Sequence, residues 1–154
     1  MTTERFVPDS FDPPHGFSDP RFVLEPLGPQ HNERDYAAWT SSMNHIRATP
    51  GFLDRSWPHP MTLEENRGDL ERHQQDFADR TGFTYTVLDP ADGDVIGCLY
   101  IYPPKDEPGV RVSSWVRADR AQLDEPLAGA IAGWLQTAWP FAQVRYLGRP
   151  GLSR

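Results

Sequence analysis

Aromatic side chains are the residues of this sequence most able to form a binding site, and they gather between residues 83 and 116. They are Tyr85, Tyr100, Tyr102 and Trp115, with the hydroxyl residues Ser113 and Ser114 close by. A pocket lined by rings and a few hydroxyls suits a small organic ligand. Aromatic residues of strands also pack in ordinary cores, and from sequence alone that packing role is the commoner one. Both interpretations stay open at this point.

The other reactive residues form no recognisable catalytic or metal-binding motif. Cys98 lies between apolar neighbours in VIGCLYIY, a setting typical of a buried packing cysteine rather than a nucleophile. His31, His45, His59 and His73 are evenly spaced, but the residues around them do not repeat. The sequence has no His-x-x-x-His pair, no Gly-x-Ser-x-Gly elbow and no glycine-rich nucleotide loop. We therefore expect no metal site and no ordinary serine hydrolase.

Composition and charge indicate one acidic, cytoplasmic domain. Of the 154 residues, 38% are hydrophobic and 24% charged, which suits a folded chain rather than a disordered one. The 22 acidic residues outnumber the 15 basic ones, so nucleic acid is a disfavoured partner. No apolar run approaches the roughly 20 residues that span a bilayer, and the first residues lack an export signal. A single cysteine cannot form an internal disulfide.

Proline placement divides the chain into three regions. We expect a proline-rich arm over 1–20, a folded domain over 21–148 and a tail over 149–154. Three aromatic residues of the arm, Phe6, Phe11 and Phe17, could fix it to the domain or to a second subunit. An unstructured end is the alternative.

Periodicity predicts the first half of the domain as one strand and two helices. The run RFVLEPL over 21–27 indicates a short strand, and the spacing over 32–47 indicates a helix. Its apolar face carries Tyr36, Trp39, Met43 and Ile46. Thr62 and Glu65 form a capping box that opens a second helix, and Gly82 marks its left-handed end.

The second half is predicted as three strands, a helix and a last strand. The strands cover 83–88, 95–102 and 110–116, and Gly97 inside the second suggests a bulge or a close approach. Simple alternation puts Tyr100 and Tyr102 on one face with Ile96 and Cys98, and Val95, Leu99 and Ile101 on the other. Asp124 is a plausible N-cap for the next helix, whose apolar face carries Leu127, Ile131, Trp134, Leu135 and Ala138. A strand over 144–147 follows, and the helical crossover makes it parallel to the strand over 110–116.

This order resembles a known family. The fold class is α+β (mixed α/β), in the order β-α-α-β-β-β-α-β. Together with RFVLEPL, VIGCLYIY, Trp115-Val116-Arg117 and EPLAGAIAGWL at 125–135, it is similar to the Gcn5-related N-acetyltransferases (GNAT), in particular the branch that acetylates N-terminal alanines of ribosomal proteins. The resemblance covers 21–148 and implies a central, mostly antiparallel sheet flanked by helices.

The resemblance also implies an acetyl-CoA site between the last two strands. Its diphosphate would lie on a glycine-rich loop at a helix N-terminus. The cofactor-binding residues carried over are Trp115, Val116, Arg117, Arg120, Ala121, Gln122 and Leu123. The loop RADRAQLDEP departs from the family pattern, because it has no glycine and places Asp124 and Glu125 near the diphosphate. Arg117 and Arg120 could offset those carboxylates.

The candidate acceptor site is aromatic. Its predicted residues are Tyr36, Trp39, Tyr85, Tyr100 and Ser113. No residue aligns with the family's catalytic tyrosine, so the catalytic residues are unknown. The resemblance implies an acyl-CoA-dependent N-acyltransferase acting on an amine of a small molecule or peptide. The alternative is a degenerate relative that has lost CoA binding and serves as a ligand-binding or protein-interaction module, with a sheet edge that the arm or a homodimer partner covers.

A third interpretation is an unrelated small α+β domain. A V-shaped divergence of the last two strands would favour the two GNAT-like interpretations over this third one.

Overall fold

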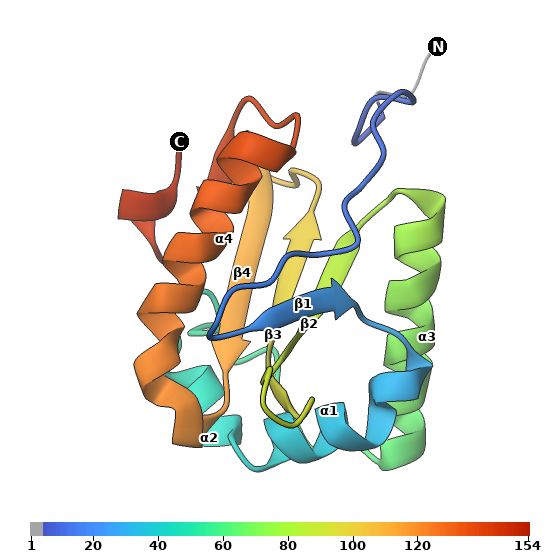
Figure 1. Cartoon of the computed structure of the whole chain (residues 1–154), viewed down its shortest axis with the longest axis vertical. Helices are drawn as coiled ribbons and strands as arrows, with labels where there is room; N and C mark the ends of the chain where they lie inside the picture. Colours follow the sequence, from blue (N-terminus) through green and yellow to red (C-terminus); the bar gives the residue numbers. More distant parts are fainter. Residues whose placement is uncertain (1–4) are drawn as a thin grey trace.

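One five-stranded sheet organises the chain. The computed structural model describes residues 5–154. The strands lie in the order β1 (Val23–Pro26), β2 (Phe83–Leu88), β3 (Val95–Tyr102), β4 (Val110–Val116) and β5 (Val144–Tyr146). The first three pairings are antiparallel, and β4 pairs with β5 in parallel. This mixed α+β architecture confirms the fold class and the parallel last pair (Figure 1).

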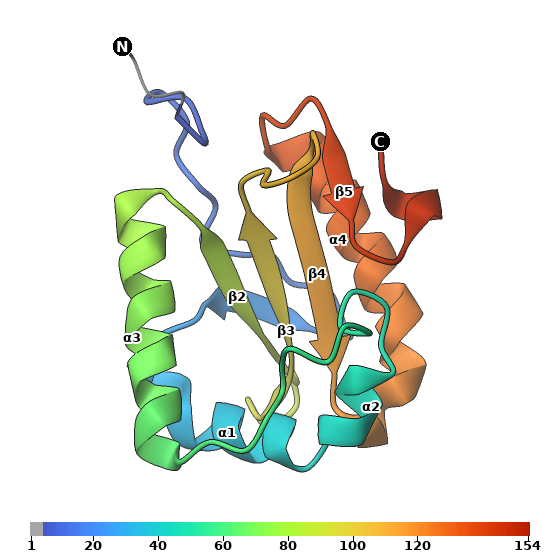
Figure 2. The ribbon, with the colours of Figure 1, turned by 180° about the vertical axis from the view of Figure 1, so that it is seen from behind.

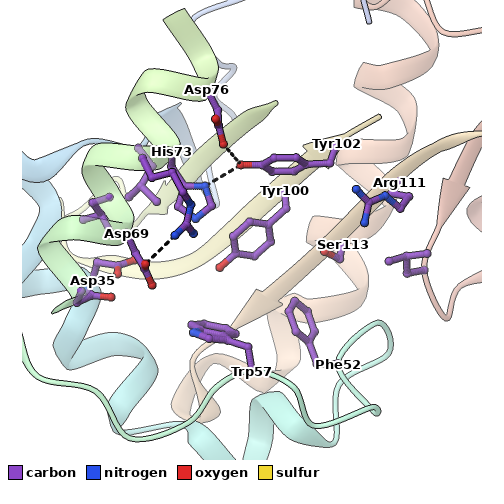
Figure 3. A pocket seen from close by; sticks show the side chains of 15 residues that line it. Asp35, Phe52, Trp57, Asp69, His73, Asp76, Tyr100, Tyr102, Arg111 and Ser113 are labelled. Atoms are coloured by element: carbon purple, nitrogen blue, oxygen red, sulfur yellow. Dashed lines mark hydrogen bonds and ion pairs between the residues drawn. The ribbon is translucent and has the colours of Figure 1, made fainter. Parts of the chain in front are cut away.

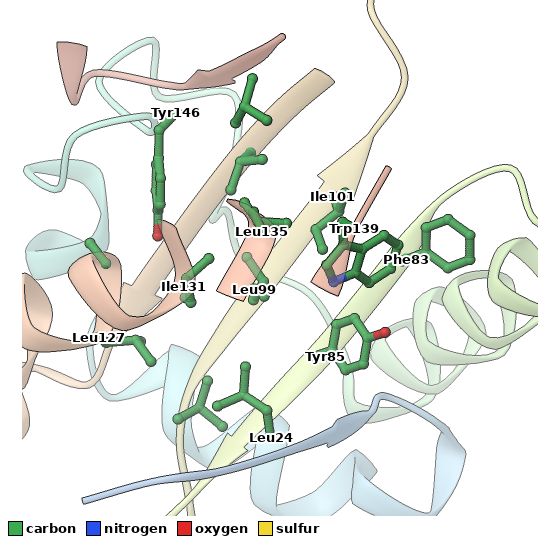
Figure 4. Packing of buried hydrophobic residues seen from close by; sticks show 14 of the residues in the cluster. Leu24, Phe83, Tyr85, Leu99, Ile101, Leu127, Ile131, Leu135, Trp139 and Tyr146 are labelled. Atoms are coloured by element: carbon green, nitrogen blue, oxygen red, sulfur yellow. The ribbon is translucent and has the colours of Figure 1, made fainter. Parts of the chain in front are cut away.

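Four α-helices within residues 5–154 flank the sheet. They are α1 (Asn32–Thr40), α2 (Met43–Arg47), α3 (Leu63–Asp79) and α4 (Asp124–Ala138). One apolar layer joins α4 to the sheet through Leu127, Ile131 and Leu135 (Figure 4). A second layer on the opposite face joins α1, α2 and α3 to the sheet through Trp39, Ile46 and Leu70 (Figures 1 and 2). None of the helices described here is both long and apolar enough to cross a membrane.

The helix predicted over 32–47 is two helices. The helical backbone breaks at Ser42, whose φ and ψ are −129° and 18°. The Ser42 hydroxyl accepts a hydrogen bond of 2.9 Å from the Ala118 N–H, in the segment after β4. Trp39 and Ile46 still share one buried layer, as their spacing predicted.

The capping box at the start of α3 is confirmed, but the end of this helix differs from the prediction. Thr62 Oγ1 accepts from the Glu65 N–H, and Glu65 Oε1 accepts from the Thr62 N–H. The left-handed residue is Arg80, with φ 63°, rather than Gly82. The Arg80 guanidinium holds this position by donating to two carbonyl oxygens of the arm. Gly82 instead makes room for an aromatic ring, because a Cβ there would lie 2.3 Å from Tyr102 Cε1.

Gly97 marks a β-bulge in β3, which corrects the simple alternation. Val87 pairs with Gly97 and Leu88 with Val95, so Ile96 is the extra residue. Val95 therefore joins the layer of Cys98, and Ile96 joins the layer of α4. A Cβ at Gly97 would lie 2.4 Å from the carbonyl oxygen of Trp115, so the close approach requires glycine.

The arm packs on the domain from residue 5 onward. Phe6 stacks against Phe83 at a centroid distance of 5.6 Å, and Phe11 lies 5.3 Å from Trp139. The third arm ring, Phe17, lies 4.9 Å from Trp134 on α4. These contacts fix residues 5–20 to the body of this chain. Residues 1–4 of the predicted arm lie outside the described residues.

The predicted tail also belongs to the packed structure. Its last residue, Arg154, exchanges two backbone hydrogen bonds with Val144, at 2.8 and 2.9 Å. The Ser153 hydroxyl accepts from the Tyr146 N–H at 2.9 Å. The tail, not the arm, thus lies along the outer edge of β5.

Removing the α3 cap will destabilise the helix that carries most of one cavity wall. We expect Thr62→Ala to lower the free energy of unfolding by about 1 kcal/mol, because the Glu65 N–H loses its acceptor. Urea unfolding measures the change. Thr62→Ser, which keeps the hydroxyl, is the control, and an equal loss in both variants would contradict a capping role.

Candidate functional site

A cavity of about 420 Å³ lies between the sheet and the helices α1 and α3. Its size falls within the range of small-molecule sites. The face of β3 and β4 that carries Tyr100, Tyr102, Arg111 and Ser113 forms one wall (Figure 3). The opposite walls come from α1, α3 and the loop after α2, which contributes Phe52 and Trp57.

Three rings line one side of this cavity. Phe52, Trp57 and Tyr100 lie with their centroids 6.1 to 6.4 Å apart in each pairing. The Trp115 indole N–H donates to the Tyr100 hydroxyl at 3.0 Å, which fixes the Tyr100 ring. Burial raises the pKa of Tyr100 well above its ordinary value, so this hydroxyl stays neutral at physiological pH. The wall is therefore apolar with one polar tip.

A buried carboxylate lies at another side of the cavity. Asp35, in the first turn of α1, is only 4% exposed and lines the cavity. One of its oxygens accepts a hydrogen bond of 3.1 Å from Asn66 Nδ2 of α3. Among the described residues it forms no ion pair. Burial raises the pKa of Asp35 to about 6, against the lowering effect of the Asn66 hydrogen bond, and nearby Asp69 raises it further.

Asn66 holds that carboxylate in place. It is 3% exposed and uses both ends of its amide. Its Oδ1 accepts from the Trp39 indole N–H at 3.0 Å, and its Nδ2 also donates to Asn32 Oδ1 at 2.8 Å. Asp35 therefore joins a buried network through one of its oxygens and cannot turn away to solvent without breaking that contact.

A histidine joins the cavity wall through a polar chain. The Tyr102 hydroxyl donates to Asp76 Oδ2 at 3.0 Å and lies 2.8 Å from His73 Nδ1. The Thr84 hydroxyl is also 3.1 Å from that nitrogen. Burial lowers the pKa of His73 to about 4, so the imidazole is neutral at physiological pH.

The structure brings together only part of the predicted acceptor site. Tyr100 and Ser113 line the cavity. Trp39 lies behind the wall with no exposed surface, and the Tyr36 hydroxyl donates to the Met61 carbonyl at 2.6 Å. Tyr85 lies in the α4 layer on the opposite face, and its hydroxyl donates to the Pro14 carbonyl. The alternation of β2 turns Tyr85 away from the cavity.

Sequence reasoning missed the polar residues of this cavity. Asp35 precedes Trp39 by four residues, so it lies on the same buried face of α1. A carboxylate four residues before a buried tryptophan is the sequence feature that could have indicated this site. His73 had no comparable signal, because its partners come from β2 and β3.

The cavity reaches the point where β5 leaves β4. The two strands pair only from Val110 to Val112, and the last backbone bond runs from the Leu147 N–H to the Val112 carbonyl. The chain then turns at Gly148, with φ 75° (Figure 2). Ser113 and Leu147, on either side of this divergence, both line the cavity. Beyond this divergence, β4 continues to Val116 without a partner residue in β5.

The loop after β4 holds its arginines in internal ion pairs. Arg117 contacts Asp94 at 2.8 Å and Asp119 at 2.9 Å, and Arg120 contacts Asp89 at 3.0 Å. Hydrogen bonds from Arg117 hold the pKa of Asp119 below its ordinary value. Both guanidinium groups thus turn toward the β2–β3 connection. Among the other predicted cofactor residues, Trp115 and Val116 are buried in opposite layers of the core.

A second cavity, of about 500 Å³, lies at the start of α4. Ala121, Gln122 and Asp124 line it together with His45 of α2. His45 Nε2 is buried, and it has no hydrogen-bond partner among the described residues. Asp124 is not the predicted N-cap, because it begins the helix and its two oxygens each accept from Arg149 at 2.8 Å.

That pairing compensates one of the two carboxylates expected to repel a diphosphate. The unpartnered His45 nitrogen and the paired Asp124 suit an anionic group at this position, whereas Glu125, which also lines the cavity and forms no ion pair among the described residues, opposes one. Arg117 and Arg120 could bind an anionic group only after a phosphate replaced one of the carboxylates with which they are paired.

Ionisation of Asp35 costs folding stability, so its neutral isostere will be more stable. The folded pKa of about 6 exceeds the unfolded value of 3.8, so the folded state binds more protons and stability falls as pH rises from 4 to 6. At pH 8, we expect Asp35→Asn to raise the free energy of unfolding by up to about 3 kcal/mol, which urea unfolding measures. The advantage should disappear near pH 4, and a pH-independent difference would contradict this account.

Comparison with known proteins places the fold. No family model and no curated protein matches the chain. Among solved structures, ribosomal-protein-S5-alanine acetyltransferase from Vibrio fischeri superposes with a TM-score of 0.61 at 14% identity, over 80% of this chain and 68% of that one. A protein described as a GNAT-family acetyltransferase from Bordetella pertussis superposes with a TM-score of 0.56 at 19% identity, over 80% of this chain and 71% of that one. Microcin C7 self-immunity acetyltransferase, in complex with acetyl-CoA and AMP, superposes with a TM-score of 0.59 at 12% identity, over 80% of this chain and 66% of that one. The chain therefore has the fold of the Gcn5-related N-acetyltransferases.

Proposed function

We propose that this protein is an acyl-CoA-dependent N-acyltransferase that acts on an amine of a small molecule or peptide. One observation carries the proposal: the acidic, aromatic cavity reaches the divergence of β4 and β5. An acceptor in the cavity and an acyl thioester entering along the divergence would meet beside Ser113. The shared fold of the neighbouring structures supports the reaction class but not a particular substrate.

The free edge of β4 would hold the pantetheine arm. Backbone groups of Val110 and Val112 face β5, as their hydrogen bonds to Gln143 and Leu147 require. Because strand residues alternate, the backbone groups of Ser114 and Val116 face the same side, beyond the last β5 pairing. When bound, the cofactor supplies an activated acyl group. The chain itself supplies the edge that would orient it.

The second cavity would hold the diphosphate. His45, Gln122 and the start of α4 line this space, and Arg117 and Arg120 lie in the loop that precedes it. Arg117 would have to release Asp119, whose side chain is 66% exposed. Because the carboxylate side of this pair is open to solvent, a diphosphate with several acceptor oxygens could reach Arg117 and replace it.

Calorimetric titration with acetyl-CoA and with CoA tests this assignment. We expect micromolar binding by the wild type and a loss of about tenfold in Arg117→Ala, because a phosphate contact is removed. Asp119→Asn should bind several-fold more tightly, because it weakens the contacts that occupy Nε and Nη2 of Arg117, while Nη1 stays on Asp94 and Val95.

Arg67→Ala is the matched control, since it removes one exposed positive charge on α3. Absence of heat and of thermal shift at millimolar ligand, in the wild type and in Asp119→Asn alike, would exclude an acyl-CoA enzyme.

The second candidate function is ligand binding without acyl transfer. The observation that favours it is the internal saturation of the donor loop: Arg117 and Arg120 are paired, and the Ala118 N–H is bound by Ser42. In that case the amine cavity would be the functional site by itself. The cytoplasmic location and the homodimer expected from the sequence are part of both proposals.

A further inference from the structure

We propose that the 420 Å³ cavity selects a cationic amine with an apolar or aromatic body, and that Asp35 pairs with its ammonium group. The role of this amine as acyl acceptor rests on the proposed function. Its binding does not, because the site is complete without an acyl donor. The inference combines a buried carboxylate without a cation and a set of rings that suits one.

Asp35 is buried without a compensating charge. Carboxylates are rarely this buried unless they are paired. The Asn66 hydrogen bond satisfies one oxygen, and the remaining acceptor capacity is directed at the cavity that Asp35 lines. Asp69, one turn of α3 away from Asn66, adds negative potential at the same side. An ammonium ion is the ligand group that would relieve both effects.

The rings beside this carboxylate suit a cation with an apolar body. Phe52, Trp57 and Tyr100 present faces and edges to the same space as Asp35 (Figure 3). Aromatic faces attract ammonium groups, most strongly when water is excluded, and they bury the carbon skeleton of the ligand. A fully polar amine would leave these rings unused.

The basic side chains that line the cavity do not supply a positive charge to Asp35. Arg72 contacts Asp69 at 2.9 Å, and Arg111 donates to the Pro103 carbonyl at 2.8 Å. His73 is neutral because burial lowers its pKa to about 4. Cys98 and Tyr100 of β3 also face Asp35 in neutral form, since burial raises the pKa of each. Between pH 5 and 7, Asp35 is thus the buried group in this set whose charge changes.

Two probes of similar shape and different charge test the proposal. Tryptamine carries an ammonium group at pH 8, and tryptophol carries a hydroxyl at the same place. By calorimetry, we expect the wild type to bind tryptamine at least about tenfold more tightly than tryptophol. Asp35→Asn should abolish this preference and leave tryptophol binding unchanged. The preference of the wild type should also decline from pH 7 to pH 5, as Asp35 takes up a proton.

Asp92→Asn is the matched control, because it removes one exposed carboxylate in the β2–β3 connection and keeps the acceptor oxygen. Near-ultraviolet circular dichroism confirms that each variant is folded. An unchanged preference in folded Asp35→Asn, or no binding of either probe by the wild type, overturns the proposal. Amine selection without any acetyl-CoA binding would uphold the cavity and reject the acyltransferase function, so the two failures are distinguishable.

Discussion

The buried amide of Asn66 is the contact on which the candidate site depends. It accepts from Trp39 and donates to Asn32 and Asp35, so one side chain of α3 binds three residues of α1. These bonds hold α1 against α3, and the cavity lies between the two helices and the sheet. Each bond therefore supports both the packing of α1 on α3 and the position of the Asp35 carboxylate.

Retaining that carboxylate lowers stability. An apolar or amide side chain at position 35 would remove the cost of burying a charge, yet the network holds an ionisable group against the cavity. Sites that bind or react often keep such destabilising groups, because the unfavourable environment is relieved by the ligand.

The two ends of the proposed reaction path are built differently. On the acceptor side a charged group lacks a partner, whereas on the donor side most charges are already matched, with Glu125 as the exception among the described residues. Arg117, Arg120 and Asp124 each contact an opposite charge within the chain. The carboxylates around Arg117 are exposed and exchangeable, but the Arg149–Asp124 pair is largely buried, with exposures of 10% and 19%. A diphosphate would thus meet a helix start at which Asp124 is compensated and Glu125 is not, and donor affinity would depend on the exchange at Asp119.

Local patterns in the sequence determined the order of elements, the capping box at Thr62 and the apolar face of α4, because each depends on residues a few positions apart. They also indicated the bulge at Gly97, although not which neighbouring residues change face. Tertiary structure alone decided that Asp35 meets Asn66, that Arg117 turns to Asp94, and that Arg80 rather than Gly82 takes the left-handed conformation. These partners are 31, 23 and about 70 residues apart in the chain. A side chain finds such partners only after the sheet has brought distant segments together, and no spacing rule along the chain can anticipate that choice.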